Sequence, residues 1–513
     1  MSTTNAAEKA AAPGRRQRTK DRATEIADTF EWLITAFILA FVFRAFVMEA
    51  FRIPTGSMAD TLMGAHFRMR CPQCGYRYNH GFIPGMYSDG RGRRLREDSI
   101  PEGRVKPPRT RCPSCGYYPS TGRALPVAHG DRILVLKCIY QFFEPKRWDV
   151  IVFKNPNQPN VNYIKRLVAL PGETIEIIDG DVYIDGQISR KPAKVQEELW
   201  MPVYDNDYRP VNPGEPAFNN HSWRVPFDFS GSGWRVDAEH PTWFSLASAP
   251  EQVHTMRYDS SMGNDFRDTY AYNSVREYAY MPVCSDLMVR FYARPGGVPG
   301  RVGAGLSKYG IEYRGWVEPD GQMIISRLSE GREEVLARRR GGAPAPGKWT
   351  LVRFANVDHL LSLEFGSEKV VYDLGRGPLD AGRIRTEISP LVEISASGNV
   401  TLSHVAIFRD IHYTQGRAGR GGRAARGRPF ELQADEFFVL GDNSPNSQDS
   451  RWWQSPGRAN NGLYYRPGIV PRDYLVGKAV FVYWPSGFKP FDSFPVAVIP
   501  NVGRMRFIYG GAR

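Results

Sequence analysis

The stretch NYIKRLVALPGETIEIIDGDVYIDGQ, from Asn162 to Gln187, decides the fold that we expect for this chain. Its Val, Ile and Leu residues form short runs between Pro, Gly and Asp, which is typical of strands joined by tight turns. Similar runs begin near His129, in HGDRILVLKCIY and WDVIVFKNP, and return much later in DEFFVLGDNSPNSQDSRWW and LVGKAVFVYWP. We therefore predict a mainly β fold, with a β-rich core that inserted segments interrupt.

The composition agrees with this prediction. A chain of 513 residues exceeds the roughly 100–200 residues of one domain, so two to four units are expected. The 42% of hydrophobic residues, the 12% of aromatic residues, the 50 Gly and the 39 Pro fit strands and turns better than a helical bundle. The net charge of +13 favours anionic surroundings, either phospholipid or nucleic acid, and charge alone does not choose between them.

The N-terminus favours the membrane. Residues 1–29 form a basic tail with the run RRQRTKDR, and a largely apolar stretch follows, which we predict to be a transmembrane anchor over residues 30–50. A buried globular helix and a cleaved signal peptide are the alternatives, but no small-residue cleavage site follows the apolar run. Basic residues before the span predict a cytoplasmic N-terminus and an extracytoplasmic remainder, with membrane phospholipid as a partner.

Two CxxC pairs follow, in RCPQCGYRYNHG and RCPSCGYYP. Two such knuckles can present four thiolates to a tetrahedral ion, so we predict a structural zinc ribbon over residues 66–126. Two disulfides or a redox pair remain open, because the predicted location is extracytoplasmic. The expected zinc ligands are Cys71, Cys74, Cys112 and Cys115, whereas Cys138 and Cys284 are expected to be packing residues.

A second insert is predicted over residues 200–413. In DLMVRFY, Leu287, Val289 and Phe291 are expected to share one face of a strand, and many such strands separated by turns predict a two-sheet sandwich. The pattern is similar to the laminin-G/concanavalin-like sandwich, which could bind a glycan or a protein. His404 and His412 are expected to be strand residues rather than metal ligands.

The Gly/Arg-rich stretch over residues 414–430 follows this insert and is expected to be a disordered linker. Its arginines could contact nucleic acid, but no nucleic-acid partner is expected for a chain with a membrane anchor.

Directly after the apolar stretch, IPTGSM places Ser57 in a glycine-containing turn. Together with GDRI at Gly130, the lysine of YIKRLVAL at Lys165, and GDNSPNSQDSR from Gly441 to Arg451, this order resembles bacterial signal peptidase I. That family consists of membrane-anchored serine proteases that remove signal peptides. The resemblance implies a catalytic core in three parts, over residues 51–65, 127–199 and 431–513.

The chemistry requires these residue types. A lysine can activate a serine hydroxyl only while its amine is neutral, so burial must lower its pKa. The resemblance implies that Ser57 is the nucleophile and Lys165 the general base, with no cofactor for catalysis. Thr55 stands where the family has a serine that helps form the oxyanion hole. The resemblance also assigns supporting roles in GDNSPNSQDSR. Ser447 would supply a hydroxyl that bonds the lysine, Asp442 would be a structural carboxylate, and Asp449 would form an ion pair with Arg451.

The resemblance also implies the substrate. Shallow apolar subsites would admit small residues before the cleaved bond, so the partners are the signal peptides of exported preproteins. These subsites would be lined by Phe51, Ile53, Met58, Leu62 and Ile164. The expected location is the bacterial inner membrane, with a single pass. A self-cleaving Ser/Lys repressor, an organellar inner-membrane peptidase and a catalytically silent membrane scaffold are the alternatives.

Overall fold

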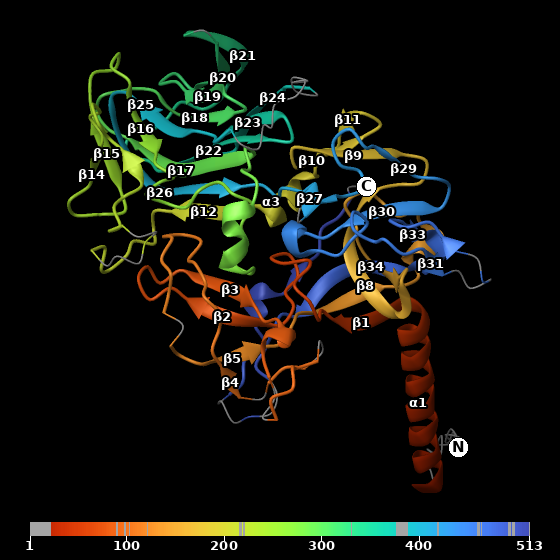
Figure 1. Ribbon diagram of the computed structural model, residues 1–513. Helices are drawn as coiled ribbons and strands as arrows, with labels where there is room; N and C mark the ends of the chain where they lie inside the picture. Colours follow the sequence, from red (N-terminus) through yellow and green to blue (C-terminus); the bar gives the residue numbers. More distant parts are fainter. Residues whose placement is uncertain are drawn as a thin grey trace, which may run out of the picture. The chain divides into compact units, whose positions relative to one another are not determined.

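The computed structural model describes residues 22–88, 91–96, 99–101, 103–120, 122–214, 218, 221–329, 331–375, 388–417, 420–458, 462, 464–490, 494 and 498–511. The chain divides into two compact units, Met1–Glu49 and Ala50–Arg513. The second unit is mainly β, as the sequence predicts (Figure 1).

The first unit contains one long helix. Helix α1 (Arg22–Val42) continues into a π-helical turn, η1 (Phe43–Val47). The stretch Glu25–Val47 has a mean hydropathy of 1.9, so it could cross a membrane by length and composition. The helix begins before the predicted boundary at residue 30, because the preceding Arg, Ala and Glu residues are good helix formers.

The core of the second unit is a sheet in which several neighbouring strands are far apart in the sequence. Its strands β7 (Val150–Asn155) and β8 (Gln158–Ala169) form an antiparallel hairpin in which Ile151 pairs with Lys165. The whole sheet has the order β1 (Met48–Arg52), β6 (Arg132–Leu136), β34 (Leu475–Trp484), β7, β8, β30 (Glu436–Leu440), β33 (Val470–Pro471), with β35 (Arg506–Phe507) paired to β34.

A smaller sheet is built around a hairpin of two strands that follow β8 in the sequence. Its order is β11 (Gln187–Ile188), β10 (Asp181–Ile184), β9 (Thr174–Ile178), β29 (Phe430–Glu431). The short helices of the core are α2 (Ile139–Phe142) and α3 (Ala193–Leu199).

The stretch 414–430 is not a disordered linker where the structure describes it, so that prediction is wrong. Ala424 is buried in the same apolar cluster as β9, and its carbonyl accepts a hydrogen bond from the N–H of Ile177 at 2.6 Å. The small Gly and Ala residues permit this close packing, which composition alone does not reveal. Two short strands pair within the stretch, β27 (Gly416–Arg417) and β28 (Arg420–Gly421).

The two CxxC pairs lie beside a small antiparallel sheet. Its order is β3 (Arg77–Gly81), β2 (His66–Arg70), β5 (Leu125–Ala128), β4 (Arg104–Val105). Each CxxC pair follows the end of a strand or an extended segment and turns back through a glycine at positive φ, Gly75 (75°) or Gly116 (78°). We call residues 66–128 the cysteine region.

Two sheets make up the part of the chain that we call the two-sheet region, residues 201–409. The first has the order β14 (Arg235–Val236), β15 (Phe244–Ala247), β26 (Asn399–Arg409), β17 (Leu287–Pro295), β22 (Thr350–Val357), β23 (Leu360–Phe365), β24 (Glu368–Asp373), with β12 (Met201–Asp205) paired to β26. The second has the order β13 (Phe227–Asp228), β16 (His254–Tyr258), β25 (Val392–Ala396), β18 (Val302–Lys308), β19 (Ile311–Val317), β20 (Gln322–Ser329), β21 (Arg332–Arg340).

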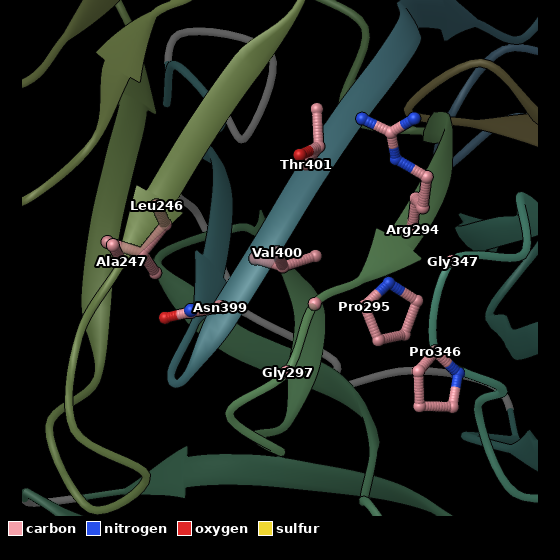
Figure 2. A pocket seen from close by; sticks show the side chains of 11 residues that line it. Leu246, Ala247, Arg294, Pro295, Gly297, Pro346, Gly347, Asn399, Val400 and Thr401 are labelled. Carbon is pink, nitrogen blue, oxygen red and sulfur yellow. The ribbon is translucent and has the colours of Figure 1, made fainter.

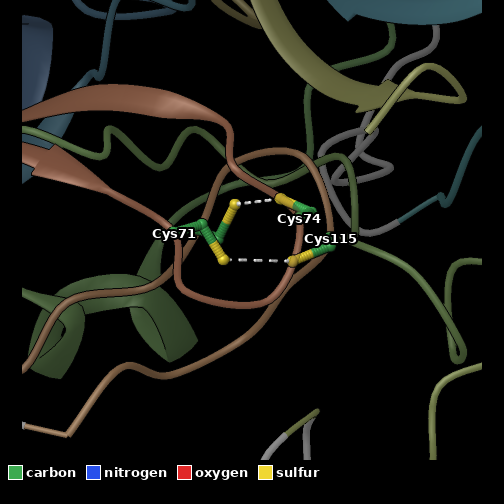
Figure 3. A group of neighbouring side chains, drawn as sticks. Cys71, Cys74 and Cys115 are labelled. Atoms are coloured by element: carbon green, nitrogen blue, oxygen red, sulfur yellow. Dashed lines mark hydrogen bonds between the residues drawn. The ribbon is translucent and has the colours of Figure 1, made fainter. Parts of the chain in front are cut away.

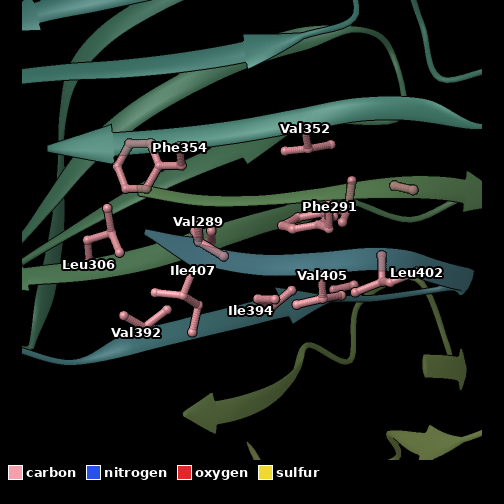
Figure 4. Close-up of a cluster of buried hydrophobic side chains, with 14 of the residues drawn as sticks. Val289, Phe291, Leu306, Val352, Phe354, Val392, Ile394, Leu402, Val405 and Ile407 are labelled. Carbon is pink, nitrogen blue, oxygen red and sulfur yellow. The ribbon is translucent and has the colours of Figure 1, made fainter. Parts of the chain in front are cut away.

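One apolar core joins the inner faces of these two sheets (Figure 4). Val289 and Phe291 of β17 lie in it with Ile394 of β25, and all three side chains are fully buried. The face predicted for DLMVRFY, Leu287, Val289 and Phe291, therefore lies in this core, although Met288 on the opposite face of β17 is buried too. Burial of this shared face stabilises the two sheets against each other.

Buried charges connect the two-sheet region to the small core sheet. Lys308 of β18 forms ion pairs with Asp286 and with Asp181 of β10, whose Oδ2 lies 3.5 Å from the amine. The N–H of Asp358 donates to Asp286 at 2.9 Å, and Lys191 pairs with Asp358 at 2.6 Å. Buried charges are tolerated when they are paired in this way, and such networks fix geometry more than they add stability.

Candidate functional site

The hydroxyl of Ser57 lies against the amine of Lys165. The Nζ of Lys165 donates to Ser57 Oγ at 2.7 Å and to the carbonyl of Ile164 at 3.0 Å. Ser57 stands in the turn after β1, and Lys165 stands on β8 within the core sheet. Two residues 108 positions apart thus form the pair that an amine-activated serine requires.

Burial lowers the pKa of this amine. Only 4% of Lys165 is exposed, and desolvation lowers its pKa to about 8. The carboxylates of Asp449 and Asp442 act in the opposite direction, and Arg451 adds to the lowering of the pKa. The amine can therefore be neutral at mildly alkaline pH, as a general base must be.

The turn that carries Ser57 is fixed at both ends by Asp131. The buried carboxylate of Asp131 accepts a hydrogen bond from the N–H of Met63 at 2.9 Å, and its carbonyl accepts from the N–H of Ile53 at 2.8 Å. A Cβ on the preceding Gly130 would lie 1.9 Å from the Ile53 carbonyl oxygen, so only glycine allows this approach. The GDRI motif is therefore a support for the serine turn.

Asn443 holds the middle of the same turn. Its N–H donates to the carbonyl of Ser57 at 3.0 Å, and its side-chain Nδ2 donates to the carbonyl of Gly56 at 3.0 Å. Asn443 also exchanges two hydrogen bonds of 2.7 Å with the side-chain amide of Asn273. The main chain around Ser57 is thus connected, through one asparagine, to a residue of the predicted second insert.

Two tyrosines from that insert complete the contact. The hydroxyl of Tyr272 donates to the carbonyl of Ala65 at 2.9 Å, and its ring fills the space beside Gly56, where a Cβ would lie 2.0 Å from the ring. The hydroxyl of Tyr270 donates to the carbonyl of Asp442 at 3.1 Å. Tyr270, Tyr272 and Asn273 therefore pack against both halves of the site, and we call residues 270–273 the bracing segment.

Two buried ion pairs flank Lys165. Arg166 binds Asp442 through two bonds of 2.8 and 2.7 Å, and both side chains are fully buried. Arg451 binds Asp449 through bonds of 2.9 and 2.7 Å, and the same carboxylate accepts the N–H of Gly441 at 3.0 Å. Each carboxylate near the lysine is thus matched by its own guanidinium, and such bidentate pairs are rigid.

One predicted contact is not present in the structure. The hydroxyl of Ser447 is buried over Gly441, but within the described residues it forms no hydrogen bond, and the bond from Lys165 goes to Ile164 instead. Thr55 is exposed, and its peptide is pressed against Gly64, where a Cβ would lie 2.4 Å from the Thr55 carbonyl carbon. The Thr55 hydroxyl is therefore near the serine turn without a fixed partner in the described chain.

The predicted subsite residues are divided by burial. Ile53, Met58 and Leu62 are buried in the core cluster behind the turn, with at most 3% of each exposed. Phe51 and Ile164 only pack against the edge of that cluster and keep partly exposed surface. A substrate could touch the last two directly, whereas the first three shape the turn from within.

The four CxxC cysteines converge (Figure 3). Their Sγ atoms all lie within 4.8 Å of one another, with 3.7 Å between Cys71 and Cys115 and 3.6 Å between Cys74 and Cys112. Four thiolates about 2.3 Å from a tetrahedral ion would lie about 3.8 Å apart, so these spacings fit zinc. They exceed the roughly 2.05 Å of a disulfide bond, and all four cysteines are free in the structure.

The contributions of Arg166, Asn443 and the bracing segment were not predicted from the sequence. Arg166 directly follows Lys165 on a strand, so its opposite orientation and need for a buried partner could have been inferred from the alternation of β8. Asn443 stands inside the GDNS stretch that the analysis singled out. No local pattern marks Tyr272 or Asn273, because their partners lie far away in the sequence.

Comparison with known proteins agrees with this geometry. The family model described as signal peptidase, peptidase S26, matches residues 117–216 and 409–484. These ranges contain Lys165 and the segment from Gly441 to Arg451, whereas Ser57 lies outside them. The gap between them corresponds closely to the predicted second insert.

Individual relatives give a similar result. Signal peptidase I of Rickettsia akari (strain Hartford) is 30% identical over 163 residues, which are 31% of this chain and 44% of that protein. Probable signal peptidase I-1 of Synechocystis sp. is 41% identical over 96 residues, which are 17% of this chain and 47% of that protein. The chain thus spans under half the length of these relatives.

Among solved structures, the carbohydrate binding module CBM66 from Bacillus subtilis aligns with 36% of this chain and 95% of its own length. Its sequence identity is 9% and the TM-score is 0.24, a similarity too low to carry an argument. The family match is therefore the informative one: two stretches of this chain, which form most of the core around Lys165, are similar to the signal peptidase family, peptidase S26.

Proposed function

We propose that this chain is a membrane-anchored serine endopeptidase of the signal peptidase I type, which removes N-terminal signal peptides from exported preproteins. The observation that carries the proposal is the 2.7 Å hydrogen bond between Ser57 Oγ and the buried amine of Lys165. The match to the signal peptidase family and the apolar N-terminal helix support the same function.

The acylation step follows from this pair. With its amine neutral, Lys165 takes the proton of the Ser57 hydroxyl while Oγ attacks the carbonyl carbon of the cleaved peptide bond. The tetrahedral intermediate then collapses, the C–N bond breaks, and the ammonium of Lys165 gives its proton to the leaving amine. The new N-terminus departs, and the signal peptide stays bound to Ser57 as an ester.

Deacylation repeats the sequence with water. Lys165 accepts a proton from water as its oxygen attacks the ester carbonyl, and then protonates Ser57 Oγ as the acid is released. The negative oxygen that forms in each half would be stabilised by the N–H of Ser57 and the hydroxyl of Thr55. The exposed, unfixed hydroxyl of Thr55 is free to turn toward such an oxygen, and one donor of this kind contributes about 10²–10³ in rate.

Substrate choice would depend on a narrow apolar surface. Phe51 and Ile164 keep partly exposed side chains beside the serine turn and would contact small residues before the cleaved bond. The anchor would hold the extracytoplasmic core at the inner membrane of a bacterium, with the N-terminus in the cytoplasm. Signal peptides end near that membrane, so the phospholipid surface would bring the enzyme and its substrate together.

The cysteine region would hold one structural zinc ion. Cys71, Cys74, Cys112 and Cys115 would be its ligands, and their spacing fits a closed tetrahedral site with no open position for a substrate. The ion would cross-link the two knuckles and take no part in peptide hydrolysis.

The domain division that we propose keeps a ribbon over residues 66–126 and a β-sandwich over residues 200–413 as inserts in the catalytic core. The contacts of Tyr272 and Asn273 with the serine turn add a role for the second insert. These residues do not touch the reacting atoms, so they are positioning residues. The sandwich would thus be needed to hold the serine turn, although it supplies no catalytic group.

Removal of either member of the reacting pair should abolish activity. Ser57→Ala and Lys165→Ala should each lower the processing of a preprotein to background, because the nucleophile and its base act as one unit. The measurement is cleavage of a preprotein by the detergent-solubilised chain. Circular dichroism should show both variants folded, and turnover by either folded variant would contradict the proposal.

Activity should depend on pH through Lys165. Its pKa is lowered to about 8, and the base must be neutral, so activity should be present above this pH and lost as the pH falls through it. The value of kcat/KM should decrease roughly tenfold for each pH unit below that pKa. A profile that stays flat between about pH 6 and pH 9, with the protein folded throughout, would exclude Lys165 as the base.

Asn273→Ala should slow the reaction without weakening substrate binding. The change leaves the buried Oδ1 of Asn443 without the donor that Asn273 supplies, at a cost of about 1–3 kcal/mol, and loosens the turn that carries Ser57. We expect kcat to decrease about tenfold, equivalent to about 1.4 kcal/mol, with KM unchanged. Ser274→Ala is the matched control, because Ser274 only caps the next helical turn. Equal kcat in both variants would show that the bracing segment does not position the serine.

Metal analysis should find one zinc ion per chain. Cys71→Ser should lose the ion, whereas Cys138→Ser should keep it, since Cys138 lies outside the cluster. Chelation should increase amide exchange over residues 66–126 and leave a measurable cleavage rate. A metal-free protein whose mass corresponds to two disulfides would favour the oxidised alternative.

A further inference from the structure

A hollow of about 520 Å³ lies on the outer face of the first sheet of the two-sheet region. Its floor is formed by β12, β26, β17 and β22, on the side opposite the apolar core. Its walls combine three aromatic residues with charged ones, namely Trp243, Trp349, Tyr292, Asp207, Arg290 and His404. The volume lies within the range of ligand pockets, about 300–1,000 Å³.

The tryptophans of this hollow are held in fixed positions. The rings of Trp243 and Trp349 meet edge to face at 5.3 Å, and the guanidinium of Arg294 lies 5.1 and 4.7 Å from their centroids. His240 stacks on Trp243 at 3.9 Å. Rings fixed in this way offer apolar contact area at little cost in conformational entropy.

The backbone of His404 points to a purpose beyond folding. His404 stands inside β26, yet its φ is 52°, in the left-handed region that residues other than glycine rarely adopt. The pairing of β26 with β17 shifts by one residue at this place, so His404 is the extra residue of a β-bulge. Bulges and strained residues concentrate where a side chain must be aimed at a ligand.

The polar groups around His404 are organised as a recognition surface. Its Nδ1 lies 2.6 Å from Asp207 Oδ2, and since a carboxylate only accepts, the proton of this bond belongs to the imidazole. The histidine side chain remains 61% exposed, so Nε2 is accessible. Arg290 lies over the ring of Phe408 at 4.6 Å and, within the described chain, forms no ion pair. Donors and acceptors thus face the hollow together.

A ligand that fits must combine hydroxyl groups with an apolar face. The carboxylates of Asp205 and Asp207 disfavour an anion, and the guanidinium of Arg290 disfavours a cation. A sugar ring has hydroxyls that both donate and accept, and C–H groups that pack on aromatic rings. We propose that this hollow is a saccharide-binding site, distinct from the Ser57–Lys165 site and independent of the function proposed for it.

A neighbouring hollow of about 630 Å³ does not have these properties (Figure 2). It lies over the ends of β15, β17 and β26, where Pro295, Gly297, Pro346 and Val400 face it. It has no aromatic side chain and shares only Arg294 with the tryptophan pair. It therefore serves as an internal comparison, since a sugar should not be recognised there.

Titration of the full-length chain with simple sugars tests the proposal. The protein is kept in a detergent that is not a glycoside, and the methyl glycosides of glucose, galactose and mannose are added separately. Tryptophan fluorescence and saturation-transfer NMR report binding. We expect at least one glycoside to bind and Trp349→Ala to weaken it at least tenfold. No binding by any of the three, nor by the two larger probes below, overturns the proposal.

His404→Gly separates ligand recognition from folding. Glycine adopts a φ near 52° without strain, so this variant should unfold at the same or a higher temperature and yet lose sugar affinity at least tenfold. Asp185→Gly is the control, because Asp185 also has a positive φ (49°) in the turn between β10 and β11. Unchanged affinity in a folded His404→Gly variant overturns the proposal.

Two larger probes distinguish the sources of the sugar. Insoluble cell-envelope polysaccharide is tested by co-sedimentation, and a synthetic glycosylated peptide by fluorescence. Competition of either probe with the bound methyl glycoside supports the site and identifies its source. If a probe binds the Trp349→Ala and His404→Gly variants as tightly as it binds the unchanged protein, the sugar binds elsewhere and the assignment is overturned.

Discussion

A buried amine beside a hydroxyl is the constraint on which the arrangement of the core depends. Lys165 is almost fully enclosed, and a charged ammonium in that position would be costly, so its pKa decreases. Two carboxylates lie near enough to oppose this effect. Each is neutralised by a guanidinium of its own, Asp442 by Arg166 and Asp449 by Arg451. The paired charges keep the structure rigid around the lysine, and burial remains the main cause of its lowered pKa.

The same constraint explains why so many contacts converge on the turn of Ser57. A hydroxyl is useful to the amine only at hydrogen-bond distance, and a free turn after a short strand would not stay there. Asp131 fixes the two ends, Asn443 fixes the centre, and the ring of Tyr272 occupies the space that Gly56 leaves open. Three glycines, at positions 56, 64 and 130, allow these backbone segments to approach so closely.

The cysteine region and the two-sheet region are joined to one another as well as to the core. The side-chain amide of Asn264 donates to the carbonyl of Pro113 at 2.8 Å and to that of Val203 at 3.1 Å, so one residue connects the cysteine region to β12. On another side, Lys308 connects β18 to Asp181 of the small core sheet. These contacts are polar and directional, and they set the relative placement of parts that each have their own apolar core.

Much of this arrangement could be predicted from the sequence, and the rest could not for identifiable reasons. Alternating apolar residues predicted the strands of β8 and β17, and the resemblance of the short motifs to signal peptidase I implied that Ser57 and Lys165 act together. The packing of Ala424 was missed because small residues look like a flexible linker when read in isolation. Tyr272 was missed because nothing near it in the sequence indicates a partner 207 positions away, at Ala65.

The separation of these partners along the chain has a consequence for synthesis. Ser57 is translated before Lys165, which follows 108 residues later, and before the asparagine that holds its turn, at position 443. Contacts of such long range form late, since their closure must await both segments. A nascent chain therefore carries Ser57 without the residues that hold its turn, and the proposed protease would become competent only after Asn443 has been translated and has packed against that turn.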